Sequence, residues 1–111
     1  MNKRRHPRMA LTGMVADISD GRGFFPGRVH DISRFGLAID DIPSKMNSHV
    51  EYLTVVIDGQ GGHFKLRIRP RWETVADRQK IVGGEIEKTS FAWTEFVLRF
   101  EPEKDDIWGN S

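Results

Sequence analysis

Between residues 9 and 87 the chain is divided into short segments by glycine, proline, aspartate and asparagine, and this division limits the fold more than any other feature. Short segments at such close spacing are typical of antiparallel sheets and barrels. We expect six strands, over residues 9–18, 27–32, 36–40, 50–58, 63–76 and 80–87. The sequence therefore predicts an all-β fold for most of the chain.

The segment 63–76 shows the clearest alternation of apolar and charged residues. Its apolar set is Phe64, Leu66, Ile68 and Trp72, and its basic set is Lys65, Arg67, Arg69 and Arg71. Because successive side chains of a strand point to opposite faces, we expect the apolar set, Trp72 included, in the core and the basic set in solvent. Pro70 cannot donate a backbone hydrogen bond, which predicts a sheet edge or a bulge.

Residues 58–62 read Asp-Gly-Gln-Gly-Gly and separate two of the expected strands. Glycine adopts the positive φ angles that tight hairpins need, so this segment predicts a turn. A phosphate-binding loop is the alternative, but it needs a following Lys-Ser/Thr and a helix, and neither follows here.

Apolar residues between positions 93 and 100 recur at helical spacing, although a strand fits them loosely. We favour a helix from Ser90 to Glu101. Thr89 or Ser90 can cap its N-terminus, and Pro102 explains its end.

The 111 residues suffice for one compact domain. Seventeen Lys and Arg against sixteen Asp and Glu give a net charge of +1, which argues against binding nucleic acid by overall charge alone. Residues 1–39 hold seven basic and three acidic side chains, whereas residues 40–111 hold ten and thirteen. Any anion site is therefore expected to be local and near the front of the chain.

Several protein classes do not fit this composition. Cysteine is absent, which excludes disulfides and thiolate zinc sites and favours a reducing, cytoplasmic location. The histidines lack zinc-site spacing and no nucleophile elbow occurs, so we expect neither a metal site nor an enzyme. No apolar stretch approaches the ~20 residues that span a bilayer, and we expect no membrane insertion and no signal peptide.

Two short segments could together hold an anionic ligand. The first is a basic arm, residues 1–8, which we expect to be flexible and which carries Lys3, Arg4, Arg5 and Arg8. Arginines four residues apart, such as Arg4 and Arg8, can fork around phosphates or donate to O6 and N7 of guanine.

The second segment is Asp31-Ile32-Ser33-Arg34-Phe35-Gly36. The Asp31 carboxylate can accept from N1 and N2 of guanine, Ser33 can bind phosphate or base, and Gly36 allows close approach to the backbone. Both segments together predict a guanine nucleotide pocket. Each alone also fits a structural interpretation, namely a solvated arm and a turn in which Asp31 bonds nearby amides.

In combination the two segments resemble the PilZ domain, a bacterial receptor module for cyclic di-GMP. Its pattern is R-x-x-x-R in an N-terminal arm and then D/N-x-S-x-x-G; here Arg4 and Arg8 match the first part, and Asp31, Ser33 and Gly36 match the second. The likeness continues through residues 27–39, Trp72 and residues 82–86, so it covers essentially the whole chain.

The resemblance implies a six-stranded antiparallel β-barrel with a C-terminal α-helix over residues 9–102, followed by a polar tail at residues 103–111. The ligand is then expected outside the barrel, with Arg4 and Arg8 on phosphate and guanine and Asp31 and Ser33 on the strand side.

Further contacts follow from the same resemblance. Arg5 is expected to add a contact, and Phe35, which stands where the family often has a small residue, can crowd the ligand or stack on it. Trp72 corresponds to an aromatic that stacks on a base in some members, although its alternation favours the core. Lys3 adds a cation that favours a stacked pair of ligands.

The resemblance thus implies a non-enzymatic cyclic di-GMP receptor without a cofactor, which relays the signal to a downstream protein. Two alternatives are a PilZ-like adaptor acting through protein contacts and a small barrel binding single-stranded nucleic acid through the basic face of residues 63–76. The intact motif residues argue against the adaptor, and the near-neutral charge argues against nucleic acid.

Overall fold

Short strands that bury alternate residues make up most of the chain. The computed structural model describes residues 6–102. Its strands are β1 (Met9–Ala10), β2 (Met14–Ser19), β3 (Phe24–Ile32), β4 (Gly36–Pro43), β5 (Leu53–Gly59), β6 (Gly62–Ala76) and β7 (Gln79–Ile86), and its helix is α1 (Phe91–Leu98).

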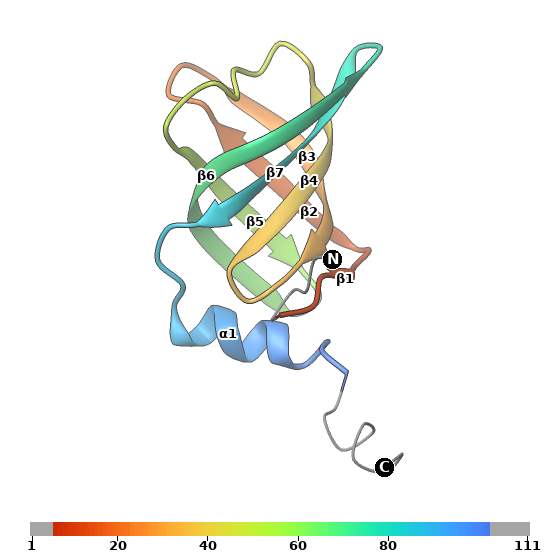
Figure 1. The fold of residues 1–111 in the computed structure, drawn as a ribbon, viewed down its shortest axis with the longest axis vertical. Coiled ribbons are helices and arrows are strands. Elements are labelled where there is room, and N and C mark those ends of the chain that lie inside the picture. Colours follow the sequence, from red (N-terminus) through yellow and green to blue (C-terminus); the bar gives the residue numbers. More distant parts are fainter. Residues whose placement is uncertain (1–5, 103–111) are drawn as a thin grey trace, which may run out of the picture.

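Strands β2 to β7 form a closed antiparallel barrel (Figure 1). Their order around the barrel is β3-β2-β5-β6-β7-β4, and pairing of β4 with β3 completes the ring. The short β1 extends the sheet beside β3, where Met9 pairs with Ile32 and Ala10 with Asp31. The predicted six-stranded barrel with a C-terminal helix is therefore confirmed, with one additional short strand.

Helix α1 lies across one end of the barrel (Figure 1). Its buried apolar side chains belong to the core cluster inside the barrel. Trp93, Phe96 and Val97 are buried, and the Trp93 ring packs edge-on against Phe64 with centroids 5.2 Å apart. Truncating a buried aromatic of this size typically costs about 3–5 kcal/mol, so α1 is part of the core.

The first expected strand, residues 9–18, is in fact two strands. Gly13 adopts a φ of +84°, which turns the chain between β1 and β2. The Thr12 carbonyl oxygen, which pairs with no strand there, accepts a hydrogen bond from the Gln60 side chain at 2.7 Å. A single glycine with positive φ therefore interrupts a segment whose composition favours a strand throughout.

The hairpin expected at residues 58–62 is confirmed. Gly59 pairs with Gly62, and the two residues between them, Gln60 and Gly61, have φ angles of +55° and +78°. Positive φ at both central residues is the pattern of a type I′ turn, which matches the twist of the flanking strands.

The predicted helix is confirmed with an earlier end. Ser90 is the N-cap, and its Oγ accepts from the Trp93 N–H at 3.0 Å. Helix α1 ends at Leu98. The residues after it form a tighter turn of the 3₁₀ type, with hydrogen bonds between residues three apart, such as that from the Phe100 N–H to the Val97 carbonyl oxygen at 2.9 Å. The described residues include no helix long and apolar enough to cross a membrane.

The lowered pKa values of two carboxylates indicate how the stability of the fold depends on pH. Hydrogen bonds from three backbone N–H groups lower the pKa of Asp20, and the bond from Asn47 has the largest effect. Hydrogen bonds from Ser48 and Lys80 lower the pKa of Glu73. A lowered folded-state pKa contributes stability above the unfolded pKa and loses it as pH falls. We expect the melting temperature to be nearly constant from pH 7 to pH 5 and to fall below about pH 4, with a smaller fall in Asp20→Asn. An acid profile that this substitution leaves unchanged would contradict the assignment to Asp20.

Candidate functional site

The Asp31–Gly36 motif forms the end of β3, a tight loop and the start of β4. The Ser33 N–H donates to the Gly36 carbonyl oxygen at 2.9 Å, and Ser33 Oγ donates to the same oxygen at 3.3 Å. A Cβ on Gly36 would come within 2.7 Å of the Gly84 carbonyl oxygen of β7. The motif glycine is therefore required by the close contact between β4 and β7.

The strand register places four residues in one row across β3, β4, β7 and β6. Asp31 of β3 pairs with Ala38 of β4, Ala38 pairs with Gly83 of β7, and Gly83 pairs with Trp72 of β6. Since neighbouring strands lie about 4.8 Å apart, the row spans about 14 Å. It has a carboxylate at one end, an indole at the other and only small residues between them.

The expectation that Trp72 lies in the core was wrong. Its side chain is 38% exposed, because the pairing of β6 with β7 shifts between Pro70 and Trp72 and leaves Arg71 as an extra residue. One extra residue reverses the face that later side chains occupy. Trp72 therefore lies over Gly83, where a Cβ would come within 2.2 Å of its ring. The bulge expected near Pro70 is confirmed.

Two residues of the basic arm contact this face. The rings of His6 and Phe35 meet edge-on with centroids 5.0 Å apart, and the Arg8 guanidinium carbon lies 5.9 Å from the centroid of the Trp72 ring. These residues border a cavity of about 310 Å³, whose lining also includes Ser33, Gly36, Arg71, Gly84 and Glu85.

The predicted site residues are thus brought together in part. Arg8, Ser33, Phe35, Gly36 and Trp72 line one cavity. Asp31 does not line it but begins the row that ends at Trp72. Lys3, Arg4 and Arg5 lie outside the described residues.

Asp31 contains a buried acceptor without a partner. Its Oδ1 atom is inaccessible to solvent and accepts no hydrogen bond from the residues described. Leaving a buried polar atom unpaired costs about 1–3 kcal/mol, and more for a charged group. The interpretation of Asp31 as a turn cap needs bonds to nearby amides, and this oxygen makes none within residues 6–102.

Two solved structures share this architecture. One is the motility inhibitor MotI/DgrA of Bacillus subtilis, with a TM-score of 0.70 and 13% identity, over 90% of this chain and 50% of that chain. The other is the PilZ domain of YcgR from Escherichia coli with c-di-GMP, with a TM-score of 0.67 and 12% identity, over 99% of this chain and 100% of that chain. The chain has the PilZ-domain fold.

The likeness concerns the fold. The PilZ-like barrel described here matches the YcgR domain over its full length but spans only half of the MotI/DgrA chain. No protein-family model matches the sequence, and no curated protein does.

In this PilZ-like barrel, helix α1 and its C-terminal extension hold the motif loop. Trp93 Nε1 donates to the carbonyl oxygens of Ser33 and Arg34 at 3.2 and 3.1 Å. Arg34 in turn donates twice to Glu101, at 2.8 and 2.9 Å. Sequence reasoning missed these supports, because Trp93 resembles an ordinary core residue and nothing in the pattern pairs Arg34 with a residue 67 positions away.

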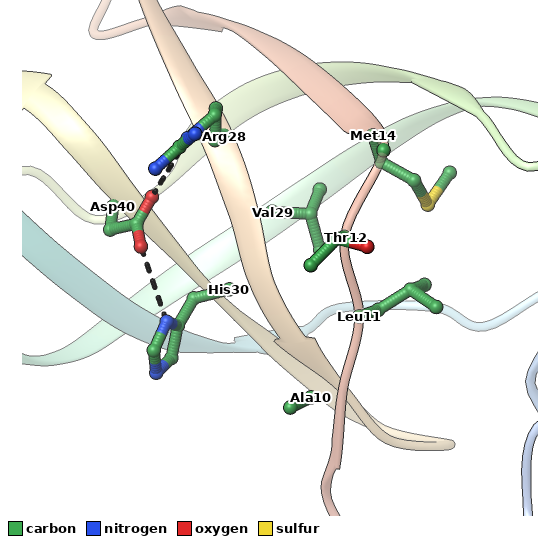
Figure 2. A pocket seen from close by; sticks show the side chains of 9 residues that line it. Ala10, Leu11, Thr12, Met14, Arg28, Val29, His30 and Asp40 are labelled. Carbon is green, nitrogen blue, oxygen red and sulfur yellow. Dashed lines mark hydrogen bonds and ion pairs between the residues drawn. The ribbon is translucent and has the colours of Figure 1, made fainter.

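A second cavity, of about 240 Å³, lies where β1 turns into β2 (Figure 2). Asp40 on its rim forms an ion pair with Arg28 at 3.8 Å and a hydrogen bond with His30 Nδ1 at 3.2 Å, as the dashed lines in Figure 2 show. None of the predicted site residues that the structure describes lines this cavity. Among residues 6–102 there is no group of three or more His, Cys, Asp or Glu side chains that could hold a metal ion.

Proposed function

We propose that this chain is a non-enzymatic cyclic di-GMP receptor that binds its ligand on the outer face of β3, β4, β7 and β6. The observation that carries the proposal is the unpaired Oδ1 of Asp31, in one row with the exposed ring of Trp72. The PilZ domain of YcgR, which has the same fold, was solved with c-di-GMP. That precedent supports a ligand of this class.

The row suits the recognition of a guanine base. When the Asp31 side chain turns outward, its carboxylate can accept hydrogen bonds from the N1 and N2 donors of guanine, and these bonds would satisfy the oxygen that is buried and unpaired in the free protein. The Trp72 ring offers a stacking surface, and stacking of a base on an aromatic side chain is worth about 1–3 kcal/mol. Of the two residues between them, Gly83 lies beneath the Trp72 ring and Ala38 is buried, so a base would approach Asp31 beside the ring and would not rest on these two residues.

The phosphates of the ligand are assigned to the arm and the motif loop. Arg8 already points toward Trp72, so a phosphate beside the stacked base lies within its reach. We propose Arg4 and Arg5 as further phosphate or guanine ligands, with Lys3 next to them. Ser33 can donate from its hydroxyl group, and Phe35 borders the same cavity as a second apolar surface.

The basic face of β6 gives little support to nucleic acid binding. Arg67 pairs with Glu87 at 3.2 Å, and Arg71 pairs with Glu85 at 2.6 Å. Arg69 donates to the Tyr52 hydroxyl at 2.6 Å. Since these cations already have partners, a nucleic acid backbone would have to displace them.

Isothermal titration calorimetry with cyclic di-GMP, cyclic di-AMP and GTP tests the proposal. We expect saturable binding of cyclic di-GMP and at least tenfold weaker binding of cyclic di-AMP, a difference of about 1.4 kcal/mol, because adenine lacks the N1 and N2 donors for Asp31. Absence of cyclic di-GMP binding would contradict the proposal and favour an adaptor that acts only through protein contacts.

We expect the basic arm, residues 1–8, to undergo a change from mobile to ordered when ligand binds. We propose that residues 1–8 are mobile in the free protein, because the contacts of His6 with Phe35 and of Arg8 with Trp72 are single ring contacts too weak to fix the arm. On binding, the arm becomes ordered across the barrel face, where it presents the signal to a downstream protein. Amide relaxation should show residues 2–8 stiffening during a titration, and calorimetry should show two ligands per chain if Lys3 helps to hold a stacked pair. An arm that is rigid throughout before ligand is added would contradict the switch, and saturation at one equivalent would contradict the pair.

A further inference from the structure

A buried polar cluster lies behind the bulge that exposes Trp72. Its centre is Lys80 of β7, which is only 5% exposed. Lys80 Nζ donates to the Met46 carbonyl oxygen at 2.5 Å, to Ser48 Oγ at 3.1 Å and to Glu73 Oε1 at 3.1 Å. All three ammonium donors therefore have partners.

Glu73 of β6 connects this cluster to the bulge. Ser48 Oγ donates to Glu73 Oε1, and His49 Nε2 lies 3.4 Å from Glu73 Oε2. The hydrogen bonds from Ser48 and then Lys80 lower the pKa of Glu73, so its carboxylate is charged at neutral pH and offsets the buried ammonium group. A buried ion pair of this kind is rarely worth more for stability than apolar side chains of similar volume.

The position of Glu73 gives the cluster a second role. Glu73 directly follows Trp72, and the bulge at Arg71 sends the carboxylate toward Lys80 while the indole faces outward. Ser48, Glu73 and Trp72 also line one small cavity of about 140 Å³. The strand can therefore return Trp72 to the inner face only if Glu73 gives up its bonds to Lys80 and Ser48.

We infer that Glu73, Lys80 and Ser48 are positioning residues that lock the bulge of β6 and so hold the Trp72 ring outward for base stacking. None of the three lines the cavity beside Arg8, so they act through Trp72 and not by touching ligand. The inference takes its ligand from the proposed function, but the orientation of Trp72 can be measured without any ligand.

The Trp72 indole N–H signal in NMR spectra, identified by its loss in Trp72→Phe, reports that orientation. In Glu73→Gln we expect this signal to shift and its heteronuclear NOE to fall in the free protein. The matched control is Glu87→Gln, because Glu87 is also ion-paired and is 28% exposed against 27% for Glu73. The control should leave the signal unchanged.

Ligand affinity gives the second measurement. We expect the Kd for cyclic di-GMP to rise roughly tenfold in Glu73→Gln, as for partial loss of a base stack, and to stay unchanged in Glu87→Gln. If the wild-type protein binds no cyclic di-GMP, the proposed function fails, and the Trp72 signal alone then decides whether the cluster positions the ring.

A general loss of stability must be separated from positioning, since Glu73→Gln leaves the Lys80 charge unpaired. The double variant Glu73→Leu/Lys80→Met removes both charges and should keep a melting temperature close to that of the wild type. The inference predicts that this folded variant still shows a shifted, more mobile Trp72 signal. A folded variant, single or double, with the wild-type Trp72 signal and NOE would overturn it.

Discussion

Replacing Arg8 with alanine should raise the Kd for cyclic di-GMP by at least about a hundredfold, because a bidentate contact has two hydrogen bonds to a charged group worth about 1.5–3 kcal/mol each. The melting temperature of the free protein should hardly change. Arg8 is exposed, and its contact with the Trp72 ring at 5.9 Å is worth only about 0.5–1 kcal/mol at such a site. Calorimetry and thermal unfolding of the same samples separate the two effects.

The control for this prediction is Arg78→Ala, which removes an equal charge from the exposed turn between β6 and β7, away from the motif loop. Its Kd should match the wild type apart from a small effect of net charge. Wild-type affinity in a variant that lacks both Arg4 and Arg8 would refute the role assigned to the arm.

Asp31→Ala should weaken binding of cyclic di-GMP by about 1.5–3 kcal/mol, the usual range for a hydrogen bond to a charged group. Discrimination against cyclic di-AMP should fall with it, because Asp31 is the acceptor assigned to the guanine donors. The free protein should lose little stability, since the buried Oδ1 of Asp31 has no partner among the described residues.

Asp40→Ala is the matched control for Asp31→Ala. Asp40 lies on the neighbouring strand β4 and also has a buried oxygen without a hydrogen bond within the described range, but it lines the other cavity. We expect Asp40→Ala to bind cyclic di-GMP with the affinity and the base selectivity of the wild-type protein. If Asp31→Ala instead lost stability and kept its selectivity, Asp31 would be a turn cap.

Much of the barrel could be predicted from the sequence, because glycine and alternating residues act locally. The turn at Gln60 and Gly61 and the cap at Ser90 depend on residues near them in the chain, and both are confirmed. The break at Gly13 was missed, since a glycine inside a strand pattern does not reveal whether its φ is positive.

Trp72 shows why the site was harder to predict than the fold. Alternation along β6 holds up to Pro70, but the extra residue Arg71 reverses it, and the polar cluster around Lys80 involves strands and a loop distant in sequence. The unpaired oxygen of Asp31 and the support of the loop by Trp93 likewise depend on tertiary contacts. Motif spacing could identify these residues as one candidate site, but it could not predict the orientation of their side chains.

A map of amide and indole NMR shifts during titration with cyclic di-GMP tests the proposed binding face most directly. We predict that the largest changes follow the row from Asp31 through Ala38 and Gly83 to the Trp72 indole, together with the loop at Ser33 and the signal of Arg8. Changes concentrated instead at the cavity beside Arg28 and Asp40, or on the outer face of β5 and β6 around Tyr52, would contradict it.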